Sequence, residues 1–232
     1  MKRRIFPKII FTLFILLQCL YFAGCAQLPD YAQPHMSSQP FDPRLKFFGY
    51  RQLQVEDFKA AAPSATIRDH KDMINAHTSL SLRPVHDIRY IISPPNLNFG
   101  LYKVYLQELH FRAVMIPERS WWNPELAPSK TTYVLQHEQI HFALMEIAAR
   151  RLNKKLAETP TLGGAISAAD IYSLEILLTE TVDKEIETSK NNTLKEHTAF
   201  DEETSLYYDP QQQQKWYDQS LKELSELLQW AR

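Results

Sequence analysis

The chain has 232 residues, a formal net charge of −1 at neutral pH and 44% hydrophobic residues. This charge balance argues against nucleic-acid binding and against a general affinity for acidic surfaces. The length and apolar content suffice for one compact domain with accessory segments. The sequence carries no internal repeat, no glycine-rich phosphate loop, and no serine or cysteine nucleophile signature.

The first 24 residues have the layout of a bacterial secretory signal. Basic residues precede a largely apolar run at 9–22, which ends in Ala23-Gly24-Cys25. A small pair directly before a cysteine resembles a lipobox, where a signal peptidase cleaves before a lipidated cysteine. We therefore expect residues 1–24 to be a lipoprotein-type signal peptide and Cys25 to be the lipidation site. Phe22 stands where an aliphatic residue is usual, which leaves ordinary cleavage or an uncleaved anchor as alternatives.

The residue after Cys25 indicates in which bacterial membrane the predicted lipoprotein would be anchored. Ala26 follows Cys25, where an acidic residue would indicate retention in the inner membrane. By analogy with bacterial lipoproteins, we expect an outer-membrane lipoprotein that faces the periplasm. Residues 25–44 combine several prolines with polar residues and are expected to form a disordered tether.

Strand patterns occupy the first half of the expected folded domain, which spans residues 45–232. The candidate strands are 46–55, 76–83, 87–92 and 101–116, with one break in alternation inside the last of these. Helical patterns follow them. Strands first and helices afterwards indicate an α+β fold with a small antiparallel sheet packed on a helix.

That helix, predicted from about Thr131 to about Asn153, contains a His-Glu-x-x-His motif. Residues four apart lie on one helix face, so His137 and His141 can bind a single metal ion. Glu138 is displaced by one position, which suits a general base acting on a metal-bound water. The three side chains lie within an apolar stripe, where buried polar groups need partners, and this favours a metal site over a structural cluster.

A catalytic zinc ion normally has three protein ligands. We predict Glu175 as the third, because it projects from an apolar stripe on the next helix, expected at 168–190, and would complete a His-His-Glu set of the thermolysin type. His197 and Asp201 remain alternative ligands, and Glu175 could instead pair with Arg150. The stripe consists of Ile171, Leu174, Leu178 and Val182.

A C-terminal amphipathic helix is predicted at 213–231, with Tyr217, Leu221, Leu224 and Leu228 at helical spacing. Packing against the domain is the simpler interpretation of this stripe. A partner-binding helix is the alternative.

From about Leu45 to Trp216, the chain resembles a family of predicted secreted bacterial zinc-dependent proteases that is catalogued as a domain of unknown function. The resemblance rests on the sequences at 51–58, Trp121-Trp122, 137–150 and 200–204. It implies a zincin-like fold, zinc bound by His137 and His141, and Glu138 as the base in peptide hydrolysis. The family often shows a His-Gly pair two residues after its match to Thr204. This chain has Leu206-Tyr207 there, so it would have to ligate zinc differently if that histidine is a ligand.

The expected function is a zinc-dependent metallopeptidase of the bacterial envelope, with Glu138 as general base. Its partners would be a peptide or protein substrate of the envelope and, through the lipid anchor, the membrane. The alternative is a non-catalytic envelope lipoprotein that uses a degenerate zincin fold as an interaction module. The missing His-Gly pair and the amphipathic C-terminal helix motivate that alternative.

Overall fold

The computed structural model describes residues 46–65, 67–68, 74–85, 87–95, 100–159, 166–204 and 208–231. The expected signal peptide, Cys25, the tether and the Leu206-Tyr207 pair lie outside these ranges. Within them, each helix is too short or too polar to span a lipid bilayer.

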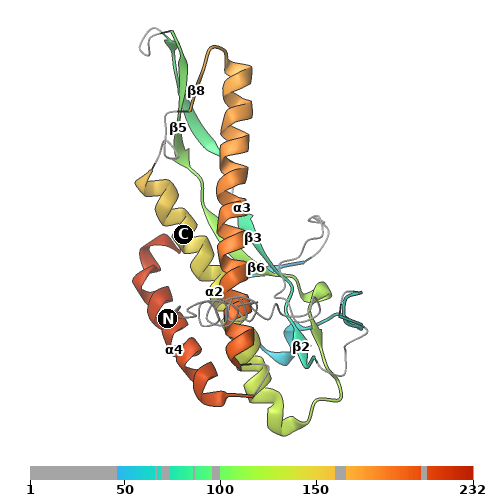
Figure 1. Cartoon of the computed structure of the whole chain (residues 1–232). Helices are drawn as coiled ribbons and strands as arrows, with labels where there is room; N and C mark the ends of the chain where they lie inside the picture. Colours follow the sequence, from blue (N-terminus) through green and yellow to red (C-terminus); the bar gives the residue numbers. More distant parts are fainter. Residues whose placement is uncertain are drawn as a thin grey trace, which may run out of the picture.

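Among the described residues, most of the short strands precede the long helices along the chain, and one strand lies between the first two of these helices (Figure 1). The strands are β1 (Phe48–Gly49), β2 (Ala76–His77), β3 (Leu80–Pro84), β4 (Arg89–Ser93), β5 (Tyr102–Glu108), β6 (Phe111–Met115), β7 (Trp121–Trp122) and β8 (Ser167–Ala168). The helices are α2 (Thr131–Glu158), α3 (Ile171–Thr204) and α4 (Pro210–Glu226). This mixture of small antiparallel sheets and helices confirms the coarse α+β prediction.

Among the described residues, the strands form three small antiparallel sheets, with strand orders β1-β6-β3, β2-β7 and β4-β5-β8. The predicted strand at 101–116 is divided, because β5 pairs with β4 whereas β6 pairs with β3. The division falls at Leu109 and His110, where the sequence alternation breaks. The first sheet lies against α2, and the third lies beside the first turns of α3 (Figure 1).

Helix α2 is the centre of the molecule, since it packs on β6 and also contacts α3 and α4. Its apolar side chains recur at helical spacing, and Phe142, Met145, Ala149 and Leu152 belong to the main buried cluster. The ring of Phe142 meets that of Tyr50 edge-on, with centroids 5.2 Å apart. The His-Glu-x-x-His motif therefore lies on a helix buried on several sides.

Two buried side-chain amides of α2, those of Gln139 and Asn153, form hydrogen bonds with backbone groups of neighbouring segments. Gln139 Oε1 accepts a hydrogen bond of 2.7 Å from the backbone N–H of Leu53. Asn153 Oδ1 accepts from the N–H of Phe111 at 2.7 Å, and Asn153 Nδ2 donates to the carbonyls of Phe111 and Trp230 at 2.9 and 3.0 Å. These amides satisfy backbone groups that would otherwise be buried without partners.

A buried ion pair ties α2 to its neighbours. Arg150 Nε donates to Glu146 Oε1 at 2.8 Å, and Arg150 Nη1 donates to the carbonyl of Leu224 at 2.6 Å. Glu146 Oε2 accepts from the N–H of Ala113 at 3.3 Å. Arg150 thus pairs with Glu146, and the alternative pairing with Glu175 is wrong.

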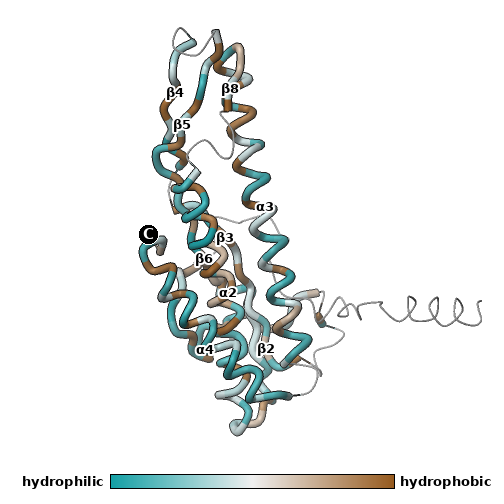
Figure 2. Tube along the Cα trace, turned by 60° about the vertical axis from the view of Figure 1, so that its left-hand side comes forward, coloured by the Kyte–Doolittle hydropathy of each residue, from teal (hydrophilic) through white to brown (hydrophobic). Residues whose placement is uncertain are grey.

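Helix α3 is longer than predicted, because it continues from the expected end near Lys190 to Thr204. In its first half, the predicted positions Leu174, Leu178 and Val182 are buried. In its second half, the buried face consists mainly of polar residues. These are Thr193, His197, Asp201 and Thr204, with Phe200 among them. Figure 2 shows hydrophilic residues along much of α3 and α4, with hydrophobic residues at intervals.

Helix α4 begins at Pro210, three residues before the predicted start, and ends at Glu226. Asp209 caps it by accepting hydrogen bonds from the N–H groups of Gln211 and Gln212. Leu224 packs with residues of α2 in a second buried cluster. The interpretation of this helix as core packing is confirmed at that position, although Leu221 is exposed.

Candidate metal centre

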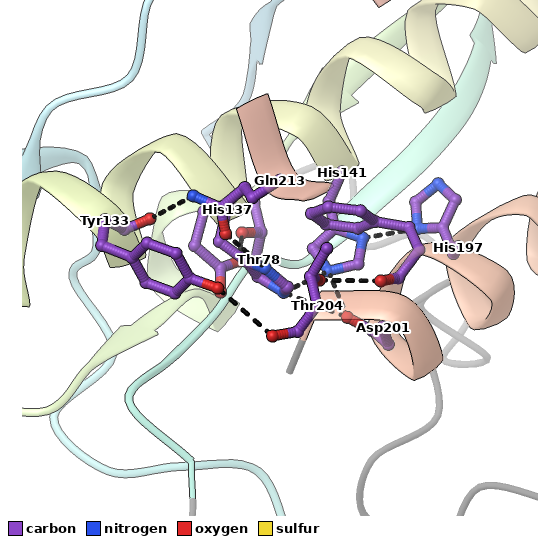
Figure 3. Close-up of polar contacts among 10 residues, drawn as sticks. Thr78, Tyr133, His137, His141, His197, Asp201, Thr204 and Gln213 are labelled. Carbon is purple, nitrogen blue, oxygen red and sulfur yellow. Dashed lines mark hydrogen bonds and ion pairs between the residues drawn. The ribbon is translucent and has the colours of Figure 1, made fainter. Parts of the chain in front are cut away.

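Three potential ligand atoms from α2 and α3 form a nearly equilateral triangle (Figure 3). Asp201 Oδ1 lies 3.0 Å from His137 Nε2 and 3.1 Å from His141 Nε2. The two histidine nitrogens are 3.1 Å apart. Within the part of the chain that the structure describes, this is the one group of three or more such residues arranged to hold a metal ion.

Apolar packing brings the two helices together at this point. Phe200, directly before Asp201, is fully buried with Ile140 and Leu144 of α2. Its ring also stacks on His137, with centroids 4.4 Å apart. Because Phe200 anchors the last turns of α3 on α2, the adjacent Asp201 carboxylate is delivered to the histidine pair.

The triangle has dimensions that suit a small divalent cation. With metal–nitrogen distances of about 2.0–2.1 Å, the donor atoms of a tetrahedral zinc site lie about 3.3 Å apart. The distances of 3.0–3.1 Å among His137, His141 and Asp201 are close to this value. Two imidazoles and one carboxylate also form a common ligand set of catalytic zinc sites.

Hydrogen accounting leads to the same conclusion. The outer nitrogen of His137, Nδ1, faces Gln213 Oε1 at 3.3 Å, and the outer nitrogen of His141 faces His197 Nδ1 at 3.1 Å. A neutral imidazole carries a single N–H. When both outer nitrogens carry the hydrogen, the inner nitrogens and the Asp201 carboxylate present only lone pairs to one another. A metal ion held among them would satisfy these lone pairs, so the residues present fit a bound metal ion; without a metal, a proton on one inner nitrogen can satisfy the same contacts.

The electrostatics keep the carboxylate ionised. Burial would raise the pKa of Asp201, but the charge of His141 and hydrogen bonds from both histidines hold it well below its usual range. Burial would lower the pKa of His141, yet the Asp201 carboxylate raises it above the ordinary value. Burial, assisted by His141, lowers the pKa of His197 well below the ordinary value, so His197 is neutral.

Glu138, the predicted general base, is buried beside this triangle with only 4% of its surface exposed. Its carboxylate accepts a hydrogen bond from the hydroxyl of Thr78, the residue that follows β2. Its charge contributes to the raised pKa of His141, which places it within electrostatic range of the ligands. The sheet side of α2 thus orients Glu138, while α3 supplies Asp201.

The structure does not bring Glu175 to this site, which corrects its prediction as the third ligand. Glu175 is exposed and accepts a hydrogen bond of 3.1 Å from the hydroxyl of Tyr90 on β4. It lies about 39 Å from Asp201 along α3, at a rise of roughly 1.5 Å per residue. Leu174 and Leu178 occupy the buried face, and Glu175 is turned out of it. Asp201, named above as an alternative, takes the place assigned to Glu175.

Other residues of the site follow less directly from the sequence. His197, also an alternative ligand, does not join the triangle but stacks on His141 with centroids 4.9 Å apart. Its Nε2 is buried without a hydrogen-bond partner among the described residues. Gln213 and Thr78 were not predicted as site residues. The spacing of Thr193, His197 and Thr204 would have indicated the longer α3, but no local pattern marks Gln213 or Thr78.

Comparison with known proteins gives no match to a family model, to a curated protein or to a solved structure.

Proposed function

We propose that this chain is a zinc-dependent metallopeptidase with a zincin-like site, in which His137, His141 and Asp201 bind the metal and Glu138 is the general base. The observation that carries this proposal is the convergence of the Asp201 carboxylate with the His-Glu-x-x-His histidines. Two helices that are distant in sequence supply the three ligands. Such an arrangement is typical of catalytic zinc, which takes three protein ligands.

Each residue has a distinct role in the proposed hydrolysis. A zinc ion supplies Lewis-acid polarisation of the scissile carbonyl and lowers the pKa of a bound water. Glu138 accepts the proton of the attacking water and transfers it to the leaving amine, which contributes about 10²–10⁴-fold to the rate. The hydroxyl of Thr78 keeps the Glu138 carboxylate in one orientation during both transfers. Asp201 balances the positive charge of the site.

The proposed substrates are peptides or proteins of the bacterial envelope. This part of the proposal follows from the expected signal peptide and from lipidation at Cys25, which would attach the domain to the membrane, with the outer membrane favoured by Ala26. The net charge of −1 supports the expectation that nucleic acid is not a substrate.

Zinc content and hydrolysis, measured together on the purified full chain, test the proposal. We expect one zinc per chain by elemental analysis and cleavage of a mixed-sequence peptide library. Glu138→Gln should retain zinc and lose at least about 100-fold in hydrolysis, because only the base is removed. His141→Ala should lose both. Thr132→Ala, at an exposed position of the same helix, should retain both. Absence of zinc after reconstitution would refute the proposal.

An interaction module without catalysis is the second candidate function. Large apolar side chains are exposed on the first turns of α3, where Tyr172 is 75% exposed and Ile171 is 45% exposed. Apolar exposure of this kind is typical of contact surfaces. Zinc binding by the wild type without cleavage of any peptide, together with unchanged function of Glu138→Gln, would favour this candidate.

A further inference from the structure

Gln213 lies in α4, outside the His-Glu-x-x-His helix and outside the ligand triangle, yet its side chain reaches the site (Figure 3). It is completely buried, with 0% of its surface exposed. The Asp209 cap fixes the start of α4 only one turn earlier. A buried amide needs partners for both its oxygen and its nitrogen, so its contacts reveal its role.

The amide of Gln213 can adopt only one orientation here. Its Nε2 donates to the carbonyl oxygen of Tyr133 at 3.0 Å and to Gln136 Oε1 at 2.8 Å. A backbone carbonyl cannot donate, so the NH₂ group must face α2 at Tyr133. Gln136 is held in the matching orientation because its own Nε2 donates to Gln214 Oε1 at 3.0 Å. The carbonyl oxygen of Gln213 is therefore the atom that faces His137.

That oxygen lies 3.3 Å from His137 Nδ1. The contact is favourable only when Nδ1 carries a hydrogen, because an amide oxygen is purely an acceptor. A neutral ring with its hydrogen on Nδ1 has a bare lone pair on Nε2. His137 Nε2 is the atom that points to Asp201 and His141.

We propose that Gln213 is a positioning residue that fixes His137 as its Nδ1–H tautomer and thereby keeps the Nε2 lone pair available for the metal ion. The tautomer assignment stands on the contacts of Gln213 alone. Its consequence for zinc rests on the proposed function. The C-terminal helix is then part of the metal centre, in addition to its packing role.

The other neutral tautomer of His137 would interfere with metal binding. With its hydrogen on Nε2, His137 would donate to Asp201 Oδ1, only 3.0 Å away. That hydrogen bond would occupy both the nitrogen and the carboxylate that bind the metal. Gln213 disfavours this tautomer, because its amide oxygen can form a hydrogen bond only with a His137 ring that carries its hydrogen on Nδ1. Loss of such an outer partner of a ligating histidine typically weakens metal binding by about 10–100-fold.

The first test reads the tautomer directly in the metal-free full chain. We would label histidine with ¹⁵N and record two-bond ¹H–¹⁵N correlations at a pH above the titration of the ring signals, with His137→Gln for assignment. We expect the Nδ1–H form of His137 in the wild type and in Gln213→Glu, which retains an acceptor. Gln213→Met, of similar shape but without an acceptor, should show the Nε2–H form. Lys222→Ala, a 78% exposed side chain farther along α4 and outside this hydrogen-bond network, should resemble the wild type.

The second test measures the zinc dissociation constant of the same proteins by competition with a chromophoric chelator. We expect Gln213→Met to bind zinc about 10–100-fold more weakly. Gln213→Glu should stay within a few-fold of the wild type, or bind more tightly, because an anionic acceptor makes the imidazole more basic. A purely structural role predicts instead that both variants lower the melting temperature and leave the affinity of the folded protein unchanged.

The outcomes separate the two proposals. An Nε2–H tautomer at His137 in the wild type overturns the role of Gln213, and so does unchanged zinc affinity in folded Gln213→Met. If Gln213→Met does not fold, the wild-type and Gln213→Glu spectra still decide, since both must show Nδ1–H. If the wild type binds no zinc, the metallopeptidase proposal fails, while the tautomer spectra continue to support or refute the role of Gln213.

Discussion

Asp201 Oδ1 lies 3.0 Å from His137 Nε2, although 64 residues separate the two in the sequence. The contact makes the last turns of α3 as important to the site as the His-Glu-x-x-His motif. It also makes Asp201, in place of Glu175, the candidate for the third metal ligand.

Asp201→Asn and Glu175→Gln distinguish the two carboxylates. Removing the charge of Asp201 should weaken zinc binding by more than the roughly 100-fold expected for an outer partner, since a direct ligand is lost. Glu175→Gln should leave affinity unchanged, because Glu175 contacts Tyr90 far from the site. Chelator competition gives both values. Tight binding by Asp201→Asn together with loss in Glu175→Gln would reinstate Glu175.

His197 should support the metal centre through His141. When His141 binds metal through Nε2, its Nδ1–H donates to His197 Nδ1, 3.1 Å away. His197→Phe retains the ring volume but removes the acceptor, and should weaken zinc binding about 10-fold or more. His197→Gln restores an acceptor and should recover part of the loss. Thr193→Val, a buried change on the same helix face, is the control and should bind zinc like the wild type.

The stability of the metal-free protein should decrease on mild acidification because of His77. Burial, aided by the charge of His141, lowers the pKa of His77 to about 4. Between pH 6.5 and about 4, the unfolded chain binds a proton at this histidine while the folded chain does not. The free energy of unfolding therefore decreases as pH falls, by about 3 kcal/mol in total at about 1.4 kcal/mol per unit. Above pH 6.5, His77 is neutral in both states and this loss of stability is absent.

Urea unfolding at several pH values, with a chelator present, measures this dependence. Comparison with His77→Gln isolates the histidine from the other titrating groups of the site. We expect the variant to lose less stability than the wild type over the same interval. Parallel pH profiles for the two proteins would contradict the prediction.

The Glu146–Arg150 pair should contribute strongly to stability. Arg150→Met leaves the Glu146 carboxylate buried without its counter-charge, which typically costs about 3–5 kcal/mol. The double variant Glu146→Gln/Arg150→Met should recover part of this loss. Arg151→Ala is the matched control, because that neighbouring side chain is 44% exposed and surface pairs contribute at most about 1 kcal/mol. Equal losses for the two single arginine variants in urea unfolding would argue against a special role for the buried pair.

The local part of the site could be predicted from the sequence. The spacing of His137 and His141 needs only helical periodicity, and α2 provides that helix. The division between β5 and β6 was also visible as a break in alternation. In both cases, the information lies within a few residues of chain.

The third ligand could not be predicted in the same way. An apolar periodicity identified the first half of α3, where Leu174 and Leu178 are buried, and Glu175 was assigned to that stripe. In the second half, the buried positions keep helical spacing but are mostly polar, as at Thr193 and His197, so a search for apolar periodicity does not find them. Gln213 meets His137 only through the packing of α4 on α2, which no short-range pattern encodes.

The order of the ligands along the chain has a consequence for biogenesis. A nascent chain that has emerged only as far as α2 offers His137 and His141 but no third donor, and the acceptor for His137 arrives later still, with α4. On the proposed function, high-affinity zinc binding would therefore follow synthesis of nearly all of residues 46–226. If the chain is exported in an extended state, as the expected signal peptide implies, it would cross the membrane without zinc and would bind the ion in the compartment where it folds.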